Sequence, residues 1–172
     1  MDGYSIIPAL PEHAPYLAAV EQAAATVFPP GSIPESIRGD SVPLPMLLAA
    51  VAAGHLWVAV DGGGVVVGFA LLQIEEGIAL VGEADVVPEH AGKGLGRRLM
   101  EAVAQRAAAE GHGALYLTTF SHVPWNMPFY TRIGFSVLPE GSAPPVLKHA
   151  LLEERARGME HRVAMRRALN PQ

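Results

Sequence analysis

The feature that most constrains this chain is a glycine-rich turn between a strand-like run and a helix-like run. Residues 78–87, IALVGEADVV, are typical of a strand. Residues 94–110, GLGRRLMEAVAQRAAAE, place apolar side chains at the helical spacing 95, 99, 103 and 107. Between them, HAGKGLGRRLM at 90–100 has glycines at 92, 94 and 96. Each glycine inside a helix costs roughly 1 kcal/mol relative to alanine, so these three need a physical reason.

Backbone N–H groups give one such reason. Because the strand ends near Val87 and the helix begins near Gly94, successive N–H groups point at one place beside the positive end of the helix. Glycine adopts positive φ and leaves room for a large anion, and Lys93, Arg97 and Arg98 add positive charge. We therefore predict phosphate binding. The alternative is that the glycines only let helix and strand pack closely.

The spacing excludes both standard nucleotide loops. A P-loop needs Ser or Thr directly after its lysine, whereas Gly94 follows Lys93. The dinucleotide fingerprint G-x-G-x-x-G follows a first strand, whereas this turn reads G-x-G-x-G after what resembles the fourth strand.

Composition narrows the class of protein. A chain of 172 residues is expected to form a single domain over 1–172. Half of the residues are apolar and 17% are charged, which excludes wholesale disorder. The net charge of -5 without a basic run argues against a nucleic-acid partner. The absence of cysteine excludes disulfides, thiolate metal sites and a cysteine nucleophile.

One uncharged run raises the question of a membrane span. Residues 41–60 have no formal charge and are long enough to cross a bilayer. The prolines at 43 and 45 and the break at Gly54–His55 instead favour a short helix over 45–53 and a strand over 55–60. The N-terminus, MDGYSIIPAL, lacks the positive region of a signal peptide. We therefore expect a cytoplasmic protein with no membrane partner.

The remaining patterns alternate between strand and helix. Strands are predicted at 4–10, 55–60, 65–74, 78–87, 114–120 and 161–169, and helices at 11–28, 45–53, 94–110 and 144–158. Residues 124–135 predict a short helix that leads into another strand. Residues 29–45 are rich in proline, glycine and serine and are predicted to form either a functional lid or a plain flexible loop. The pattern indicates an α+β fold with one layered sheet of mixed strand direction.

Two separated segments, VVPEHAGKGLGRRLM at 86–100 and NMPFYTRIGF at 126–135, resemble the GNAT superfamily of acyl-CoA-dependent N-acyltransferases. In that family the loop reads [RQ]-x-x-G-x-[GA], and the second block reads N-x-x-x-x-FY-x-x-x-GF with small variations. The order and spacing of the elements from residue 4 to 169 are similar too. The resemblance implies a GNAT-like, mostly antiparallel mixed sheet of about seven strands, flanked by helices and splayed between the fourth and fifth strands.

The resemblance also implies acetyl-CoA as co-substrate, without a metal. Backbone N–H groups would hold the coenzyme A pyrophosphate, from Ala91, Gly92, Lys93, Gly94, Leu95, Gly96 and Arg97. The backbone at Asp85, Val86 and Val87 would pair with the pantetheine arm as if it were an added strand, and Asn126 would bind the arm from the other side. Ala91 stands where the family usually has Arg or Gln, so one side-chain contact is missing and somewhat weaker binding is expected.

Acyl transfer from a thioester to an amine poses two proton problems. An amine with a lysine-like pKa near 10.4 is neutral about once in 2,500 molecules at pH 7, a cost of roughly 4.6 kcal/mol unless a base removes the proton. The departing thiolate must also be protonated. For this acid we favour Tyr130, which the resemblance places near the coenzyme sulfur. The alternative is a core aromatic that packs against Phe129 and Phe135.

For the base, Glu83 and Asp85 lie two apart on a predicted strand, so a regular pleat puts both carboxylates on one face. Close like charges raise one pKa toward neutrality. We favour Glu83, a position where many family members have an acidic residue. A water relay or a solvated edge carboxylate are the alternatives, and a bulge would change which side chain faces the cleft.

Other polar and aromatic residues give weaker predictions. The seven histidines show no metal-ligand spacing. His122 is interpreted as an end-of-strand polar residue, the alternative being that it lines the substrate cleft. Glu21 is interpreted as an exposed helical glutamate, the alternative being that it faces an amine substrate, and Trp125 is interpreted as a packing residue.

The favoured function is N-acetyl transfer from acetyl-CoA to a primary amine of a small molecule or peptide, by direct attack in a ternary complex. A non-catalytic acyl-CoA sensor module is the alternative. No motif identifies the acceptor. Oligomeric state is left open, a homodimer being the commonest assembly.

Overall fold

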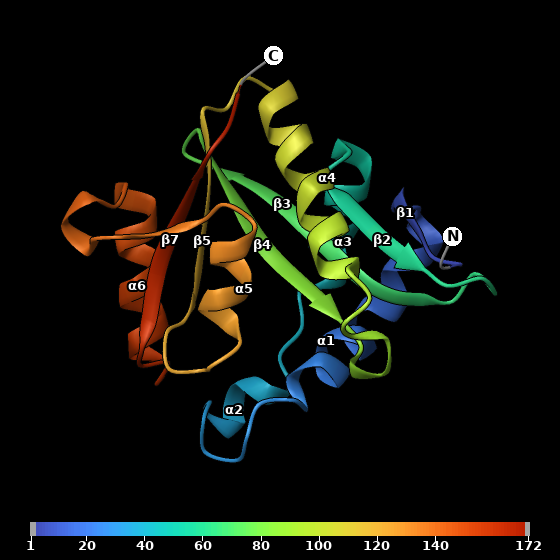
Figure 1. Cartoon of the computed structure of the whole chain (residues 1–172), viewed down its shortest axis with the longest axis horizontal. Coiled ribbons are helices and arrows are strands. Elements are labelled where there is room, and N and C mark those ends of the chain that lie inside the picture. Colours follow the sequence, from blue (N-terminus) through green and yellow to red (C-terminus); the bar gives the residue numbers. More distant parts are fainter. Residues whose placement is uncertain (1–2, 171–172) are drawn as a thin grey trace.

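The predicted strands form one seven-stranded sheet in the order β1-β2-β3-β4-β5-β7-β6 (Figure 1). The structure is a computed structural model and describes residues 3–170. Neighbouring strands are antiparallel except β4 and β5, which run parallel. The α+β fold class with its mixed, mostly antiparallel sheet is therefore confirmed. The strands are β1 (Ser5–Pro8), β2 (Leu56–Val60), β3 (Val66–Glu75), β4 (Ile78–Val86), β5 (Ala114–Phe120), β6 (Ser136–Leu138) and β7 (Arg162–Ala168).

Helices cover both faces of the sheet because its strands are apolar on both sides. In β3, Leu71 packs with the buried side chains of α1 (Leu17–Ala25) and α3 (Leu44–Ala53), whereas Leu72 packs beneath α4 (Leu95–Ala109). This alternation follows from the pleat, which points successive side chains to opposite faces. Helix α5 (Asn126–Arg132) lies on the α4 side, and α6 (Pro145–Ala156) covers β5 and β7 on the other side. Figure 1 shows α4 and α5 in front of the sheet.

Two predicted segments differ from the structure. The first helix was predicted over 11–28, but residues Pro11–Tyr16 form a 3-10 helix and the α-helix begins only at Leu17. Pro15 accounts for the difference, because proline lacks the N–H that an α-helix needs in its interior. The segment 29–45, predicted as a loop, contains the short helix α2 (Glu35–Arg38).

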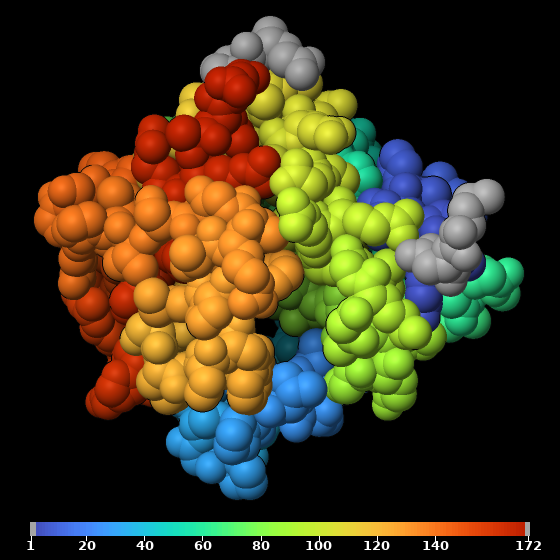
Figure 2. Space-filling model, viewed as in Figure 1, coloured from blue at the N-terminus to red at the C-terminus, as the bar shows by residue number. Residues whose placement is uncertain are grey.

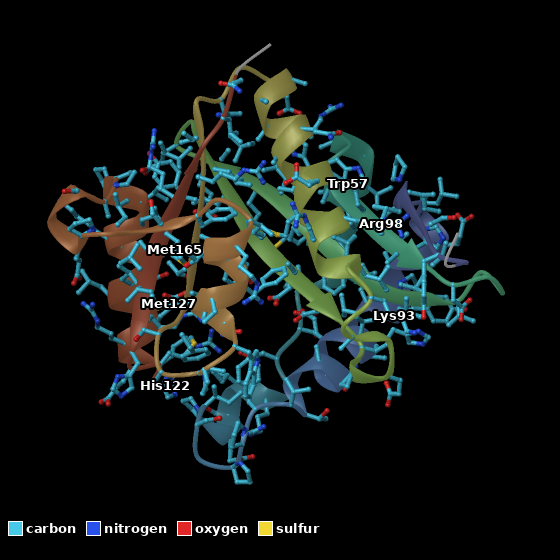
Figure 3. All side chains as sticks on the ribbon, in the orientation of Figure 1. Trp57, Lys93, Arg98, His122, Met127 and Met165 are labelled. Atoms are coloured by element: carbon cyan, nitrogen blue, oxygen red, sulfur yellow. The ribbon has the colours of Figure 1, made fainter. Side chains whose placement is uncertain are left out.

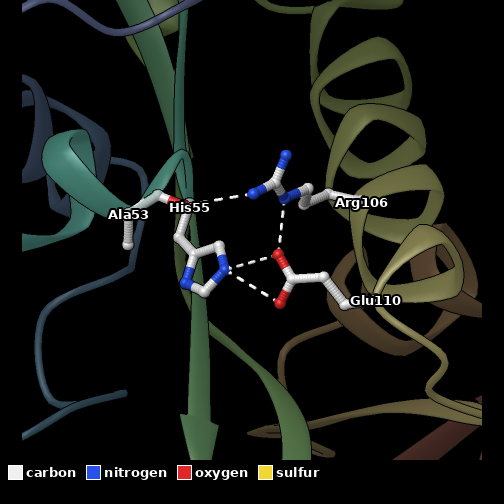
Figure 4. Close-up of polar contacts among 4 residues, drawn as sticks. All are labelled: Ala53, His55, Arg106 and Glu110. Atoms are coloured by element: carbon white, nitrogen blue, oxygen red, sulfur yellow. Dashed lines mark hydrogen bonds and ion pairs between the residues drawn. The ribbon is translucent and has the colours of Figure 1, made fainter.

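A polar cluster ties the turn before β2 to the C-terminal end of α4 (Figure 4). His55 Nε2 lies 2.8 Å from Glu110 Oε2, Arg106 donates to the same carboxylate, and Arg106 Nη2 donates to the Ala53 carbonyl at 3.3 Å. Burial opposes ionisation of Glu110, but hydrogen bonds from His55 and Arg106 outweigh it, so the pKa of Glu110 is lowered. The cluster fixes α4, whose opposite end faces the glycine-rich turn.

The uncharged run at 41–60 is divided between α3 and β2, as predicted. Gly54 ends α3 in the left-handed conformation, with φ of 75°. Among residues 3–170, every helix is too short or too polar to span a bilayer.

Candidate active site at the splay between two strands

The site is located where β4 and β5 separate. The two strands pair only at Ala79–Leu115 and Leu80–Tyr116. Beyond that point the edge of β4 that faces β5 is unpaired, so the backbone there is open to a ligand. The splay predicted between the fourth and fifth strands is thus confirmed.

A bulge at Gly82 decides which side chains of β4 face this opening. Leu71 pairs with Glu83 and Leu72 pairs with Val81, so Gly82 has no partner in β3. Val81 packs in the core beneath α4. A regular pleat would send Glu83 to that same face, but the extra residue shifts the alternation. Glu83 and Asp85 therefore emerge on the α1 side, as the sequence analysis anticipated for a bulged strand.

A cavity of about 800 Å³ lies on the α4 side of the splay. Figure 2 shows this hollow between the orange surface of α5 and the yellow-green surface of the turn before α4. It is lined by the end of β4, the glycine-rich turn, the first turn of α4, residues of α5 and the end of α1.

The three glycines have two different roles. Gly92 and Gly94 have φ of 76° and 78°, a conformation that other residues rarely adopt. Gly96 lies against α5, because a Cβ there would be 3.2 Å from Cζ of Phe129. Two glycines therefore shape the turn, and the third allows α4 to pack closely against another helix rather than against a strand. Phosphate binding by the turn stays a prediction.

The start of α4 presents free backbone donors. A helix that begins at Leu95 has no intrahelical partner for its first N–H groups, and within residues 3–170 no side chain caps them. The residues from Ala91 to Gly94 are exposed. The turn thus offers N–H groups and the positive end of the helix dipole to the cavity.

Most of the residues predicted to bind coenzyme A line this cavity. They are Asp85, Val86, Ala91, Gly92, Gly94, Leu95, Gly96, Arg97, Asn126 and Tyr130. Lys93 and Val87 are not among the lining residues. Figure 3 shows Lys93 on the turn that precedes α4.

Hydrogen bonds within the sheet limit which backbone groups of β4 could pair with an added strand. The Val87 N–H donates to the Val67 carbonyl at 2.9 Å, and the Val87 carbonyl accepts from the His90 N–H at 3.0 Å. Because alternate residues of a strand face opposite neighbours, the backbone of Asp85 also faces β3. The groups on the open side therefore belong to Ala84 and Val86, rather than to the whole run from Asp85 to Val87.

A second cavity of about 460 Å³ lies on the opposite, α1 side of the splay. Five carboxylates line it. Asp40 and Glu154 are paired with arginines, and the other three are those of Glu21 from α1 and of Glu83 and Asp85 from β4. One oxygen from each of these three lies within 4.8 Å of the other two. This cavity is acidic at its centre.

Burial and mutual repulsion change the ionisation of these carboxylates. Burial, followed by the charge of Glu83, raises the pKa of Glu21 from 4.5 to about 7. Burial raises the pKa of Asp85 from 3.8 to about 6, although a hydrogen bond with Glu83 lowers it. Burial and then the charge of Asp85 raise the pKa of Glu83 well above its usual value. Carboxyl groups with pKa values near neutrality suit general base catalysis.

The interpretation of Glu21 as an exposed glutamate was wrong. Its side chain is only 8% exposed, and its Oε2 accepts a hydrogen bond from the Val42 N–H at 2.9 Å. The signal was available in the sequence, because Glu21 lies four residues after Leu17 and next to Val20, both of which are buried. The apolar stripe of α1 therefore includes Glu21.

Tyr130 lies where the two cavities meet. It lines both of them, together with Phe28, Ala84, Asp85 and Asn126. Its ring also packs edge-on against Phe129 and Phe135, at centroid distances of 5.1 and 6.0 Å. Burial and the negative charges of Asp85 and Glu83 raise the pKa of Tyr130 above its ordinary value, so it is a neutral hydrogen-bond donor.

The outer wall of the acidic cavity consists of ion pairs. Arg162 Nη2 donates to Glu154 Oε1 at 2.9 Å and to Thr118 Oγ1 at 3.0 Å. Arg157 pairs with Asp40. The segment 29–45, which contains Asp40, thereby closes one side of the cavity.

Two further residues were assigned from sequence. His122 follows β5 (Figure 3) and its Nε2 lies 2.7 Å from the Ser32 carbonyl oxygen, outside the acidic cavity. Trp125 packs against Phe28, with ring centroids 6.2 Å apart, but it is 43% exposed and lines the larger cavity.

The fold is similar to that of solved acetyltransferases. An acetyltransferase of the GNAT family from Staphylococcus aureus Mu50 matches with a TM-score of 0.72 and 16% identity, over 96% of this chain and 99% of that chain. PaiA N-acetyltransferase from Thermoplasma acidophilum, solved with coenzyme A, matches with a TM-score of 0.70 and 16% identity, over 96% and 98%.

N-acetylglutamate synthase from Neisseria gonorrhoeae, solved with coenzyme A and N-acetyl-glutamate, gives a TM-score of 0.71 and 19% identity. The match covers 96% of this chain but 35% of that chain, so the chain spans about a third of the synthase. At these identities the likeness shows the fold. The model of the Acetyltransferase (GNAT) family matches residues 22–135, which is more than half of the chain. With the splayed sheet and the glycine-rich turn, this match shows that the chain belongs to the Acetyltransferase (GNAT) family.

Proposed function

We propose that this protein is an N-acetyltransferase that transfers an acetyl group from acetyl-CoA to a primary amine of a small molecule or peptide. The single observation that supports this most is the junction of the two cavities. Asp85, Asn126 and Tyr130 line both the cavity beside the glycine-rich turn and the acidic cavity. Two substrates that enter from opposite faces of the sheet would meet there, as direct attack in a ternary complex requires.

In this proposal the glycine-rich turn binds the diphosphate of acetyl-CoA. The uncapped N–H groups at the start of α4 and the helix dipole favour an anion at this position. Val86 and Ala84 present backbone groups along the unpaired edge of β4, where they would bind the amides of the pantetheine arm. Asn126, at the start of α5, would bind the arm from the opposite side of the splay.

The carboxyl pair Glu83–Asp85 would act as the base. Acetyl-CoA supplies an acetyl group activated as a thioester. The pair accepts a proton from the acceptor ammonium, and the nitrogen lone pair then forms a bond to the thioester carbonyl carbon as the carbon–sulfur bond breaks. A carboxyl pair with raised pKa values lies closer to the pKa of an amine, so the proton transfer costs less than it would to an ordinary carboxylate.

Tyr130 would stabilise the departing sulfur. Because its pKa is raised, the hydroxyl keeps its proton at neutral pH and donates a hydrogen bond to the developing thiolate. The nitrogen loses its second proton as the amide forms, and this proton replaces the one that Tyr130 passes to the thiolate, so the hydroxyl is protonated again at the end of the reaction.

The test is thiol release from acetyl-CoA in the presence of a panel of amines. We expect Tyr130→Phe to lower kcat by about a hundredfold or more, with the dissociation constant of acetyl-CoA changed less than about threefold, because the phenyl ring keeps its packing. Tyr16→Phe is the matched control, since Tyr16 is 65% exposed and lines neither cavity. Equal losses in turnover and affinity would assign Tyr130 to binding. Acetyl-CoA binding without turnover on any amine would favour the sensor module instead.

A further inference from the structure

A histidine lies directly before the glycine-rich turn. His90 is the last residue of the 3-10 helix Pro88–His90 that follows β4, and its N–H donates to the Val87 carbonyl at 3.0 Å. Its half-buried side chain lines the larger cavity. We propose that His90 binds the diphosphate of acetyl-CoA through Nε2–H and that Tyr4 holds the ring in position for this contact. The inference rests on the proposed use of acetyl-CoA and adds a side-chain donor to the backbone site.

Tyr4, near the N-terminus, holds one side of the His90 ring. The Tyr4 hydroxyl lies 2.6 Å from His90 Nδ1, and the two rings meet edge-on with centroids 5.6 Å apart. Tyr4 packs against the core beneath α4 and lines neither of the two cavities. Because the His90 ring lines the larger cavity while its Nδ1 faces Tyr4, the side of the ring that is open to the cavity is the one that contains Nε2.

The contact with Tyr4 also decides which ring nitrogen carries the proton. A neutral imidazole has one N–H donor and one acceptor, and the hydrogen bond made by one nitrogen sets the state of the other. A phenol hydroxyl is a stronger donor than a neutral imidazole, so the Tyr4 hydroxyl donates to Nδ1 and Nε2 carries the proton. The His90 side chain forms no other hydrogen bond within residues 3–170. The Nε2–H donor is therefore unused there.

The surroundings of His90 favour an anion as the partner of this donor. Between residues 90 and 96, His90 is the one cavity-lining residue whose side chain has an N–H group, because the others are alanine, glycine or leucine. The uncapped N–H groups at the start of α4 and the positive end of its dipole attract negative charge to the same place. A hydrogen bond from Nε2–H to a phosphate oxygen is charge-assisted and stronger than one between neutral groups.

Two ligands and two variants of His90 test the contact. Acetyl-CoA has the diphosphate, and S-acetylpantetheine has the same thioester arm without it. His90→Phe keeps an aromatic ring but has no donor. With the full-length protein, it should raise the dissociation constant of acetyl-CoA about tenfold and that of S-acetylpantetheine less than about twofold. His90→Gln, whose amide N–H can replace Nε2–H, should bind acetyl-CoA within about threefold of wild type.

A second half-buried histidine provides the matched control. His112 lies beyond the far end of α4 and lines neither of the two cavities, so His112→Phe should leave both dissociation constants unchanged. Equal affinities for acetyl-CoA in wild type and His90→Phe would overturn the proposal. Equal losses for acetyl-CoA and S-acetylpantetheine in His90→Phe would overturn it too, because they would indicate a change in the fold rather than a lost phosphate contact.

Imidazole ¹⁵N resonances test the role of Tyr4 as a positioning residue. In ¹H–¹⁵N spectra of the ligand-free protein, we expect the proton on Nε2 of His90. The Nε2 resonance should shift with acetyl-CoA or inorganic pyrophosphate but not with S-acetylpantetheine. Tyr4→Phe should change the Nδ1 resonance and weaken acetyl-CoA binding about two- to fivefold. A proton on Nδ1 of the ligand-free protein, or an Nε2 resonance that acetyl-CoA leaves unchanged, would overturn the proposal.

Failure of this inference differs from failure of the proposed function. Acetyl-CoA binding and thiol release that are both unchanged in His90→Phe would refute only the contact with His90. Binding of acetyl-CoA by the wild type without thiol release on any amine would refute the N-acetyltransferase, and the loss of affinity in His90→Phe would still support the diphosphate contact.

Discussion

Glu21→Gln should make the ligand-free protein more stable at alkaline pH. The Glu21 side chain is 8% exposed and lies beside Glu83, and its pKa is raised from 4.5 to about 7. A carboxyl with a raised folded-state pKa contributes its full stability below the unfolded-state pKa and loses it as the pH rises through the folded-state value. Glu21 therefore destabilises the fold progressively between about pH 4.5 and about pH 7.

The size of this effect follows from the pKa difference. Each unit of pKa difference corresponds to about 1.4 kcal/mol. The rise in the pKa of Glu21 from 4.5 to about 7 therefore lowers the free energy of unfolding by about 3 kcal/mol at pH 8. A glutamine has no charge to lose and still offers an oxygen to the Val42 N–H. Removing the Glu21 charge also relieves Asp85, whose pKa it helps to raise.

The assay is urea unfolding of wild type and variant at pH 5 and pH 8. We expect similar free energies of unfolding at pH 5 and a variant that is about 2 to 3 kcal/mol more stable at pH 8. Glu75→Gln, at an exposed position, should show no such pH dependence. A Glu21→Gln variant that is less stable than wild type at pH 8, or a difference that does not change with pH, would refute this reasoning.

Two other substitutions test the polar cluster and the glycine-rich turn. Glu110→Gln should lower the free energy of unfolding by about 0.5 to 1 kcal/mol at pH 6 and leave it unchanged at pH 3. The reason is that the lowered pKa of Glu110 stabilises the fold above the unfolded-state pKa, and this stabilisation is lost as the pH falls. Urea unfolding at both pH values measures the difference. An equal loss of stability at pH 3 would contradict the prediction. Gly94→Ala should strain the backbone by about 1 to 2 kcal/mol, because φ is 78°, and raise the acetyl-CoA dissociation constant in calorimetry by about fivefold or more. Gly111→Ala is the control, because Gly111 has φ of 91° at the far end of α4. This variant should be equally strained but should bind acetyl-CoA normally. Equal acetyl-CoA affinities in the two variants would exclude the turn as the binding site.

Much of the fold could be predicted from the sequence because its signals are local. The helical spacing of α4 and the apolar runs of β2 to β5 specify elements that the structure contains at nearly the same bounds. The interior proline at 15 was the local signal overlooked in the first helix. Helix α2 could not be predicted, because a four-residue helix has no periodicity to detect.

The parts of the site that a backbone feature defines could be predicted from the sequence. The parts that depend on tertiary packing were harder to predict. The turn with Gly92 and Gly94 was recognisable from glycine spacing alone. The bulge at Gly82 depends on the register between β3 and β4, which no local pattern specifies. Glu21 joins Glu83 and Asp85 only when α1 packs on the splayed strand, so the acidic cavity as a unit could not be predicted from the sequence.

The central claim is that backbone N–H groups at the start of α4 bind acetyl-CoA beside the open edge of β4. The most direct measurement is a ¹H–¹⁵N NMR titration of the full chain with acetyl-CoA. We predict that the largest amide shifts occur at residues 92–97, with a second set at Val86 and Ala84 and small changes at Val87, whose N–H is bonded to Val67. Saturable binding that leaves the amides of 92–97 unshifted would contradict the account.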